Sequence, residues 1–257
     1  MIEILKILFC LPFLFYSCYT DLKSRNISNR LWKSMLASGS GFVLYELFFG
    51  ALPPLEALKA LLLSSGLVFL SVYILFQLGA FGGGDAKGLI VLSILFPSYP
   101  TFELLGQTYP FVGLPPIGLF TFTVLGNALL LTIIVPLGMF GYNLLHYSSD
   151  MLQKPYYMFI GYKTPIATLK EKEHLALLEK FEETEKGQIK RKHVRAGLNF
   201  EINQLPELET YAKKGLIEDK VWVTPGLPFM LSITAGFLVA VLFGDLIFYL
   251  ILLFIQG

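Results

Sequence analysis

Charge and cysteine are both scarce in this chain of 257 residues, and each scarcity excludes a class of protein. Only 15% of the residues are charged, whereas a typical soluble domain has about 25%. The 20 basic residues nearly balance the 19 acidic ones, so no excess of positive charge is available to bind a nucleic acid. Two cysteines are too few for a disulfide framework or a four-cysteine zinc site. The chain is therefore neither a nucleic-acid binder nor a disulfide-stabilised domain.

Apolar residues are abundant instead, at 54% of the chain, with a mean hydropathy of +0.63. The charges gather in residues 142–220, which hold 13 of the 20 basic and 12 of the 19 acidic residues. This pattern predicts a membrane protein with one polar insertion. We expect a membrane domain of five helices over residues 1–141, a soluble cytoplasmic insertion over 142–224, and a sixth transmembrane helix over 225–257.

Six apolar segments suggest the fold class, an all-α polytopic membrane protein with a small α+β insertion. A helix needs about 20 apolar residues to cross a bilayer. The fourth segment is too short alone and would need the following residues, 97–116, to complete its crossing. Pro136 predicts a kink in the fifth. In the insertion we expect an amphipathic helix over 169–189 and strands near 189–202 and 221–223. The six expected spans are residues 2–20, 31–50, 57–78, 86–96, 117–142 and 227–255.

Basic residues alternate between the loops, which predicts the orientation of the chain. The loop over residues 22–33 carries four basic residues, and the polar insertion carries 13. The loop over 51–56 and the C-terminal tail carry none. Because basic loops stay in the cytoplasm, both termini should lie outside, and loop one and the turn over 82–87 should face the cytoplasm.

Two acidic residues stand at the same expected depth, on the cytoplasmic side of the membrane. Asp21 ends the first span and Asp85 opens the fourth. Two carboxylates that share one site hold a single proton between them, because both cannot ionise easily. The ionised partner can take a proton from water while the protonated partner donates to a carbonyl, as peptide hydrolysis requires. Asp245 lies in an apolar run near the outer interface, and we expect a structural role for it.

Three glycines, Gly82, Gly83 and Gly84, come directly before Asp85, and Lys87 follows it. A run without side chains would let an extended substrate strand approach the carboxylate, and it could also act as a hinge. Lys87 would add positive charge beside Asp85. The run could equally be a packing contact between helices, with Asp85 as a helix cap.

Other reactive side chains offer no second site. The three histidines, His146, His174 and His193, are not spaced as metal ligands, and we expect neither a metal nor a cofactor. Cys10 and Cys18 are expected to be buried packing residues.

The segment from Asp21 to Asn29, D-L-K-S-R-N-I-S-N, and the segment from Gly82 to Lys87, G-G-G-D-A-K, resemble the type IV prepilin peptidase family. These are G-x-G-D intramembrane aspartic proteases, and the likeness is greatest to the archaeal preflagellin (prearchaellin) peptidases. The resemblance implies that Asp21 and Asp85 are catalytic, without a metal. It implies substrates that are precursors of archaellin or type IV pilin-like subunits, cut at the cytoplasmic face of the cell membrane between a short basic leader and an apolar helix.

Two other functions fit the same residues. A proton-coupled transporter or channel could use Asp21 and Asp85 as a relay, and it would move ions or solutes without cutting a peptide bond. A structural membrane subunit with a docking domain would tolerate asparagine at both positions.

Overall fold

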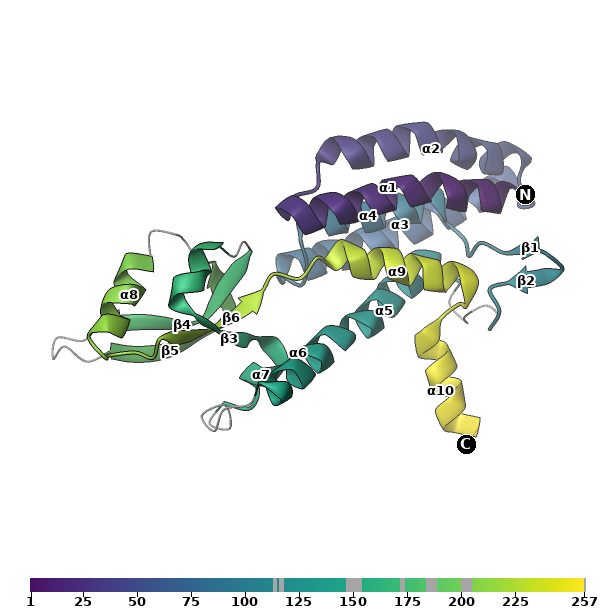
Figure 1. Cartoon of the computed structure of the whole chain (residues 1–257). Coiled ribbons are helices and arrows are strands. Elements are labelled where there is room, and N and C mark those ends of the chain that lie inside the picture. Colours follow the sequence, from purple (N-terminus) through teal and green to yellow (C-terminus); the bar gives the residue numbers. More distant parts are fainter. Residues whose placement is uncertain are drawn as a thin grey trace. The chain divides into compact units, whose positions relative to one another are not determined.

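The computed structural model describes residues 1–112, 115, 118–146, 154–171, 174–183, 189–199 and 205–256 (Figure 1). The chain divides into two compact units. The first, called the helical unit here, comprises Met1–Thr132 and Pro228–Gly257. The second, called the mixed unit, comprises Ile133–Leu227. The division places the apolar helices of both chain ends in the helical unit, and the polar insertion together with the apolar helix Ile134–Leu145 in the mixed unit.

The helical unit is an assembly of apolar helices around one buried core (Figure 1). Local signals set the helix ends: Arg25 adopts a left-handed conformation where α1 stops, and the Ser28 hydroxyl accepts the N–H of Arg30 where α2 begins. Proline at the first position opens α3, where its missing N–H costs nothing. The helices are α1 (Ile2–Ser24), α2 (Asn29–Phe49), α3 (Pro54–Gln77), α4 (Gly83–Leu95), α5 (Phe120–Thr132), α9 (Phe229–Leu242) and α10 (Leu246–Gln256).

Three helices among the described residues are long and apolar enough to cross a membrane: Ile2–Ser24, Pro54–Gln77 and Phe120–Leu145. A fourth is reached if the bent pair α9 and α10 counts as one span. The expectation of a mostly helical protein with several candidate spans is confirmed, whereas the number six is not. The helix α4 has only 13 residues, and α2 carries Arg30, Lys33 and Glu46 within its length.

Charged residues inside α1 and α2 pair with each other. Lys6 is buried, and its Nζ lies 2.5 Å from Oε1 of Glu46 and 3.2 Å from Oε2 of Glu3. The same ammonium lies 4.8 Å from the centre of the Phe96 ring. A buried charge is tolerated when it is paired, so this cluster lets charged residues stand inside apolar helices.

The single helix expected over residues 227–255 is wrong, because the chain breaks between α9 and α10 with a bend of 61°. Gly244 has φ 110°, which interrupts the helix, and Asp245 caps α10 by accepting the N–H of Phe248 at 3.0 Å. The side chain of Asn127 bridges the break, since it donates to the Gly244 carbonyl and accepts the N–H of Leu246. Asp245 therefore has the structural role expected of it.

After α4 the chain forms a short hairpin of β1 (Phe102–Leu104) and β2 (Gln107–Tyr109). The N–H groups of Phe111 and Val112 donate to carbonyls at the end of α9. The helical unit thus covers part of the backbone that follows the fourth expected span. The fifth expected span corresponds to α5 and α6, which are interrupted at Ile133. Pro136 has no N–H to donate to the carbonyl four residues earlier, which explains an interruption at this place.

The mixed unit contains a four-stranded antiparallel sheet with the order β3-β6-β4-β5. The expected α+β character of the insertion is confirmed, and the strands expected near 189–202 and 221–223 are β5 and β6, apart from residues 200–202, which lie outside the described residues. Its elements are α6 (Ile134–Leu145), α7 (Tyr157–Ile160), β3 (Tyr162–Pro165), the 3₁₀ helix η2 (Ile166–Glu171), β4 (Leu175–Glu183), β5 (Ile189–Asn199), α8 (Leu205–Lys213) and β6 (Lys220–Pro225).

The amphipathic helix expected over residues 169–189 is wrong, because most of its described part is the strand β4. The apolar stripe that suggested a helix consists of Leu175, Leu178 and Phe181, and its two leucines pack on two sides of the strand. Leu175 and Leu177 join one apolar cluster, while Leu178 joins another with Trp222. The pairing register of β4 shifts between Leu177 and Glu179. This irregularity accommodates an apolar spacing that departs from strict alternation and therefore resembles the pattern of a helix.

Candidate active site

Asp21 lies in the last turn of α1 and is only 8% exposed. Its Oδ2 accepts the backbone N–H of Met230 at 3.2 Å. Met230 belongs to the first turn of α9, where N–H groups have no partner within the helix. The N-terminal end of a helix also favours a negative charge. Asp21 is thus held at the beginning of the helix that follows the mixed unit in sequence.

Asp85 lies in the first turn of α4 and is also 8% exposed. Its Oδ2 accepts the N–H of Gly82 at 3.1 Å and caps the helix. Its Oδ1 is buried and has no hydrogen-bond partner among the described residues. A buried polar atom without a partner calls for an explanation, and a bound substrate or water is a common one.

The structure brings the two aspartates to one polar cavity of about 530 Å³. Loop one, which joins α1 to α2, forms one side of it, and the glycine turn before Asp85 forms another. The lining residues are Asp21, Arg25, Asn26, Ile27, Ser28, Asn29, Gly82, Gly83, Gly84, Asp85 and Lys87. The two aspartates, the three glycines before Asp85, and Lys87 therefore all lie around the same space.

Two glycines of the second motif region allow close packing. A Cβ on Gly84 would lie 3.0 Å from Cδ1 of Ile27, and a Cβ on Gly88 would lie 3.0 Å from Cη2 of Trp32. Such distances are shorter than most contacts of a Cβ atom, so glycine at these positions favours the close approach of loop one and the start of α2 to α4. Of the two interpretations left open by the sequence, the contact of Gly84 supports packing between helices, and Gly88 adds a second contact of this kind.

Among the described residues, the ammonium group of Lys87 is not bonded to Asp85. Its Nζ donates instead to Oδ1 of Asn29 at 2.7 Å. This bond joins the N-terminal parts of α4 and α2 at the edge of the cavity, and both side chains are exposed. Lys87 therefore links the two motifs.

Sequence reasoning missed the contribution of α9 to the site. The Sγ of Cys18 donates to the Met230 carbonyl at 3.3 Å and lies 3.0 Å from Oγ1 of Thr234. Cys18 is buried, as expected, but it makes polar contacts that packing alone does not require. The available signal was its position three residues before Asp21, which places both on one side of α1.

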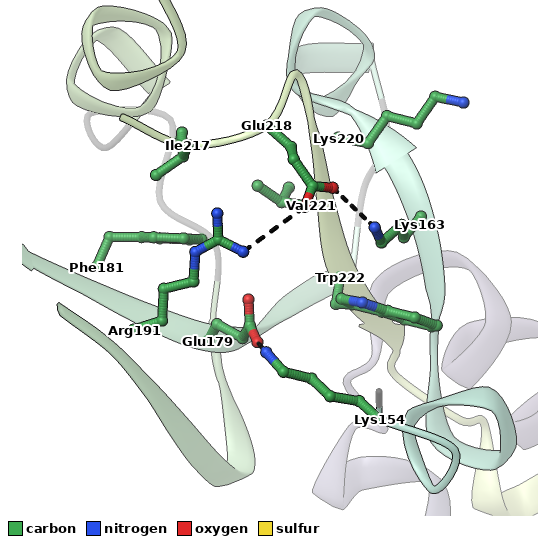
Figure 2. A pocket seen from close by; sticks show the side chains of 10 residues that line it. All are labelled: Lys154, Lys163, Glu179, Phe181, Arg191, Ile217, Glu218, Lys220, Val221 and Trp222. Atoms are coloured by element: carbon green, nitrogen blue, oxygen red, sulfur yellow. Dashed lines mark hydrogen bonds and ion pairs between the residues drawn. The ribbon is translucent and has the colours of Figure 1, made fainter. Parts of the chain in front are cut away.

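A second cavity, in the mixed unit, has a different character (Figure 2). It holds only about 50 Å³, and its carboxylates are paired with its cations. Glu218 contacts Lys163 at 2.8 Å and Arg191 at 3.7 Å, and Glu179 pairs with Lys154. These pairs leave few polar groups for a ligand to bind. Of the two, the cavity of Asp21 and Asp85 is therefore the better candidate for a reaction.

The cavity of Asp21 and Asp85 has the features of an acid–base site. Two buried carboxylates face one space, and each has one oxygen fixed by a backbone N–H. Such fixing leaves the second oxygen of each group to contact a water or a substrate. Searched over the described residues, histidine, cysteine, aspartate and glutamate form no group of three or more that could hold a metal ion. The arrangement can transfer protons to and from a bound molecule.

Comparison with known proteins gives two family matches. A sequence profile described as the type IV leader peptidase family matches residues 8–139. A second, described as the archaeal peptidase A24 C-terminus, type II, matches residues 153–246.

Three relatives, all named preflagellin peptidase, are similar over most of their length. The one from Methanocaldococcus jannaschii is 28% identical over 88% of both chains. That from Methanococcus voltae is 26% identical over 90% of this chain and 92% of its own. That from Methanococcus maripaludis is 27% identical over 88% of this chain and 89% of its own.

Proposed function

The chain belongs to the type IV leader peptidase family of membrane aspartic endopeptidases, and on that premise we propose that Asp21 and Asp85 are its catalytic pair. The observation that carries the proposal is their placement on one polar cavity, each with one oxygen bound to a backbone N–H. The unpartnered Oδ1 of Asp85 supports it further, because a reacting water would satisfy that atom.

The reaction follows from the two carboxyl groups. A water molecule between them loses a proton to the ionised group, and its oxygen forms a bond to the scissile carbonyl carbon. The protonated group donates its proton to the carbonyl oxygen at the same time. When the tetrahedral intermediate collapses, the C–N bond breaks and the protonated carboxyl group donates its proton to the leaving amine. The ionised carboxylate takes a proton from one hydroxyl of the intermediate as the new carbonyl forms, which restores the pair. No charge builds up on the protein, since one proton is shared throughout.

The substrates are precursors of archaellin or of type IV pilin-like subunits, cut between a short basic leader and an apolar helix. The names of the three relatives support this class of substrate. The apolar helix would remain in the membrane, and the leader would enter the cavity in an extended form, because a helical peptide bond is shielded from attack. Gly82 and Gly83 add no side chain to the cavity wall, and this favours the approach of a backbone.

The site faces the cytoplasm, where the leader of a newly made precursor is found. Lys23, Arg25, Arg30 and Lys33 on and beside loop one support this side of the membrane. Six crossings would follow if α2 and α4 each traverse the bilayer together with the segments beside them. The pairing of Lys6 with Glu46 supports a position of α2 within the bilayer, because it neutralises a charge that α2 carries.

The test is to incubate the full-length protein in proteoliposomes with an archaellin precursor and to determine the new N-terminus by mass spectrometry. The account expects one cut, at the boundary between leader and apolar helix. The variant with both Asp21→Asn and Asp85→Asn should give no product. A cut elsewhere in the precursor, or equal cleavage by the double variant, would contradict the proposal.

A further inference from the structure

Two side chains of α1 bind the backbone of Met230 in the first turn of α9, one at its N–H and the other at its carbonyl. The N–H of Met230 donates to Oδ2 of Asp21 at 3.2 Å, and the carbonyl of Met230 accepts the thiol of Cys18 at 3.3 Å. The Sγ of Cys18 also lies 3.0 Å from the hydroxyl of Thr234, one turn further along α9. Four residues on two helices are thus joined by three hydrogen bonds.

The direction of these bonds follows from counting protons. A thiol has one proton, and the proton of Cys18 is directed to the Met230 carbonyl. The hydroxyl of Thr234 must then be the donor to Sγ. The result is a continuous chain of hydrogen bonds that runs from Thr234 through Cys18 and Met230 to the carboxylate of Asp21.

The part of this hydrogen-bond chain formed by Cys18 and Thr234 is buried away from solvent. Cys18 is 6% exposed and Thr234 is 3% exposed. A buried donor or acceptor that loses its partner is costly, and neighbouring groups shift to compensate. Because Cys18 and Asp21 are three residues apart on α1, a shift of α9 against Cys18 also moves the Met230 N–H relative to the carboxylate of Asp21.

From this geometry we infer that Cys18 and Thr234 are positioning residues, which fix the carboxylate of Asp21 by fixing the N–H that binds it. The inference rests on the proposed function, since it presumes that Asp21 reacts. It assigns to Cys18 a role different from that of Cys10, which lies about two turns earlier on α1 and is buried within the apolar core.

The experiment measures kcat and KM for precursor cleavage by Cys18→Ala, Thr234→Val and Thr234→Ser, each in the full chain. Valine has the shape of threonine without the hydroxyl, whereas serine keeps the hydroxyl. Cys10→Ala is the control for a lost buried thiol. Thr121→Val is the control for a lost buried hydroxyl, because Oγ1 of Thr121 is buried with no hydrogen-bond partner among the described residues.

We expect kcat to fall by about 10-fold to 100-fold in Cys18→Ala and Thr234→Val, the cost of a small displacement of a reacting group, while KM stays within about twofold. Thr234→Ser and both controls should keep kcat close to that of the unmodified protein. The double variant Cys18→Ala/Thr234→Val should be no slower than the slower single variant, because both changes break the same chain.

A kcat unchanged by Cys18→Ala and Thr234→Val would overturn the inference, and so would a Thr234→Ser variant as slow as Thr234→Val. Losses that multiply in the double variant would also overturn it. The activity of Asp21→Asn distinguishes failure of this inference from failure of the proposed function. If that variant is inactive while the positioning variants are fully active, only the inference fails. If Asp21→Asn cleaves normally, the proposed function itself fails.

Discussion

Asp85 accepts the backbone N–H of Gly82 at 3.1 Å through one oxygen, Oδ2, and leaves the other, Oδ1, buried without a partner among the described residues. The two oxygens therefore have separate tasks. One caps α4 and fixes the side chain, and the other is left without a partner in a residue that lines the cavity shared with Asp21. An aspartate that served only as a helix cap would not need to line a polar cavity.

The contact of Gly88 with Trp32 gives the first prediction. In Gly88→Ala the new Cβ would lie 3.0 Å from ring atoms of Trp32, so this buried ring must shift by a few tenths of an ångström. We expect a loss of about 1–3 kcal/mol in the free energy of unfolding and slower cleavage, since the start of α2 is part of the cavity wall. The measurements are thermal unfolding in detergent and the initial rate of precursor cleavage.

Two further variants test the cause of that loss. Adding Trp32→Phe to Gly88→Ala removes the outer ring atoms and should restore part of the rate. Gly66→Ala in α3, where nothing lies within 4 Å of the new Cβ, should not destabilise the protein. If Gly66→Ala and Gly88→Ala behave alike, the close approach at Gly88 does not matter.

The bond between Lys87 and Asn29 gives the second prediction. Lys87→Met removes the 2.7 Å contact that joins the N-terminal parts of α4 and α2 beside the cavity. A hydrogen bond contributes about 1 kcal/mol, so we expect the KM for the precursor to rise by about fivefold. The matched control is Lys59→Met, which breaks an exposed pair with Glu56 on α3. Equal KM values for the two variants would contradict a role for Lys87 in shaping the cavity.

The ion cluster of Lys6 gives the third prediction, on stability. Lys6→Met leaves Glu3 and Glu46 facing each other without the cation between them. Breaking a buried pair from one side costs about 3–5 kcal/mol. The unfolding temperature should therefore fall clearly, and Lys6→Met combined with Glu46→Gln should recover part of the loss. An unchanged unfolding temperature in Lys6→Met would show that the cluster does not stabilise the helical unit.

Particular residues show what the sequence could predict. The placement of Asp21 and Asp85 at one cavity followed from depth alone, because each stands at the end of an apolar segment on the side with basic loops. The α+β character of the insertion followed from its charge and alternation. These are properties of local pattern, and a single sequence contains them.

Other features depend on contacts between distant residues. Leu175 and Leu178 suggested a helix, but they pack into different clusters on two sides of β4. The break at Gly244 is stabilised by Asn127, more than one hundred residues away in the sequence. The contact between Cys18 and Thr234 joins residues that are 216 positions apart in the sequence. Local pattern contains no information on such partners.

Cleavage of one precursor by Asp21→Asn and by Asp85→Asn, each measured against Glu56→Gln at equal protein level, tests the central claim most directly. Glu56 is an exposed acid on α3 and lines no part of the cavity. The account predicts that each asparagine variant cleaves about 10²–10⁴-fold more slowly than the unmodified protein, while Glu56→Gln cleaves at the rate of the unmodified protein. Cleavage at that rate by either asparagine variant would contradict the account.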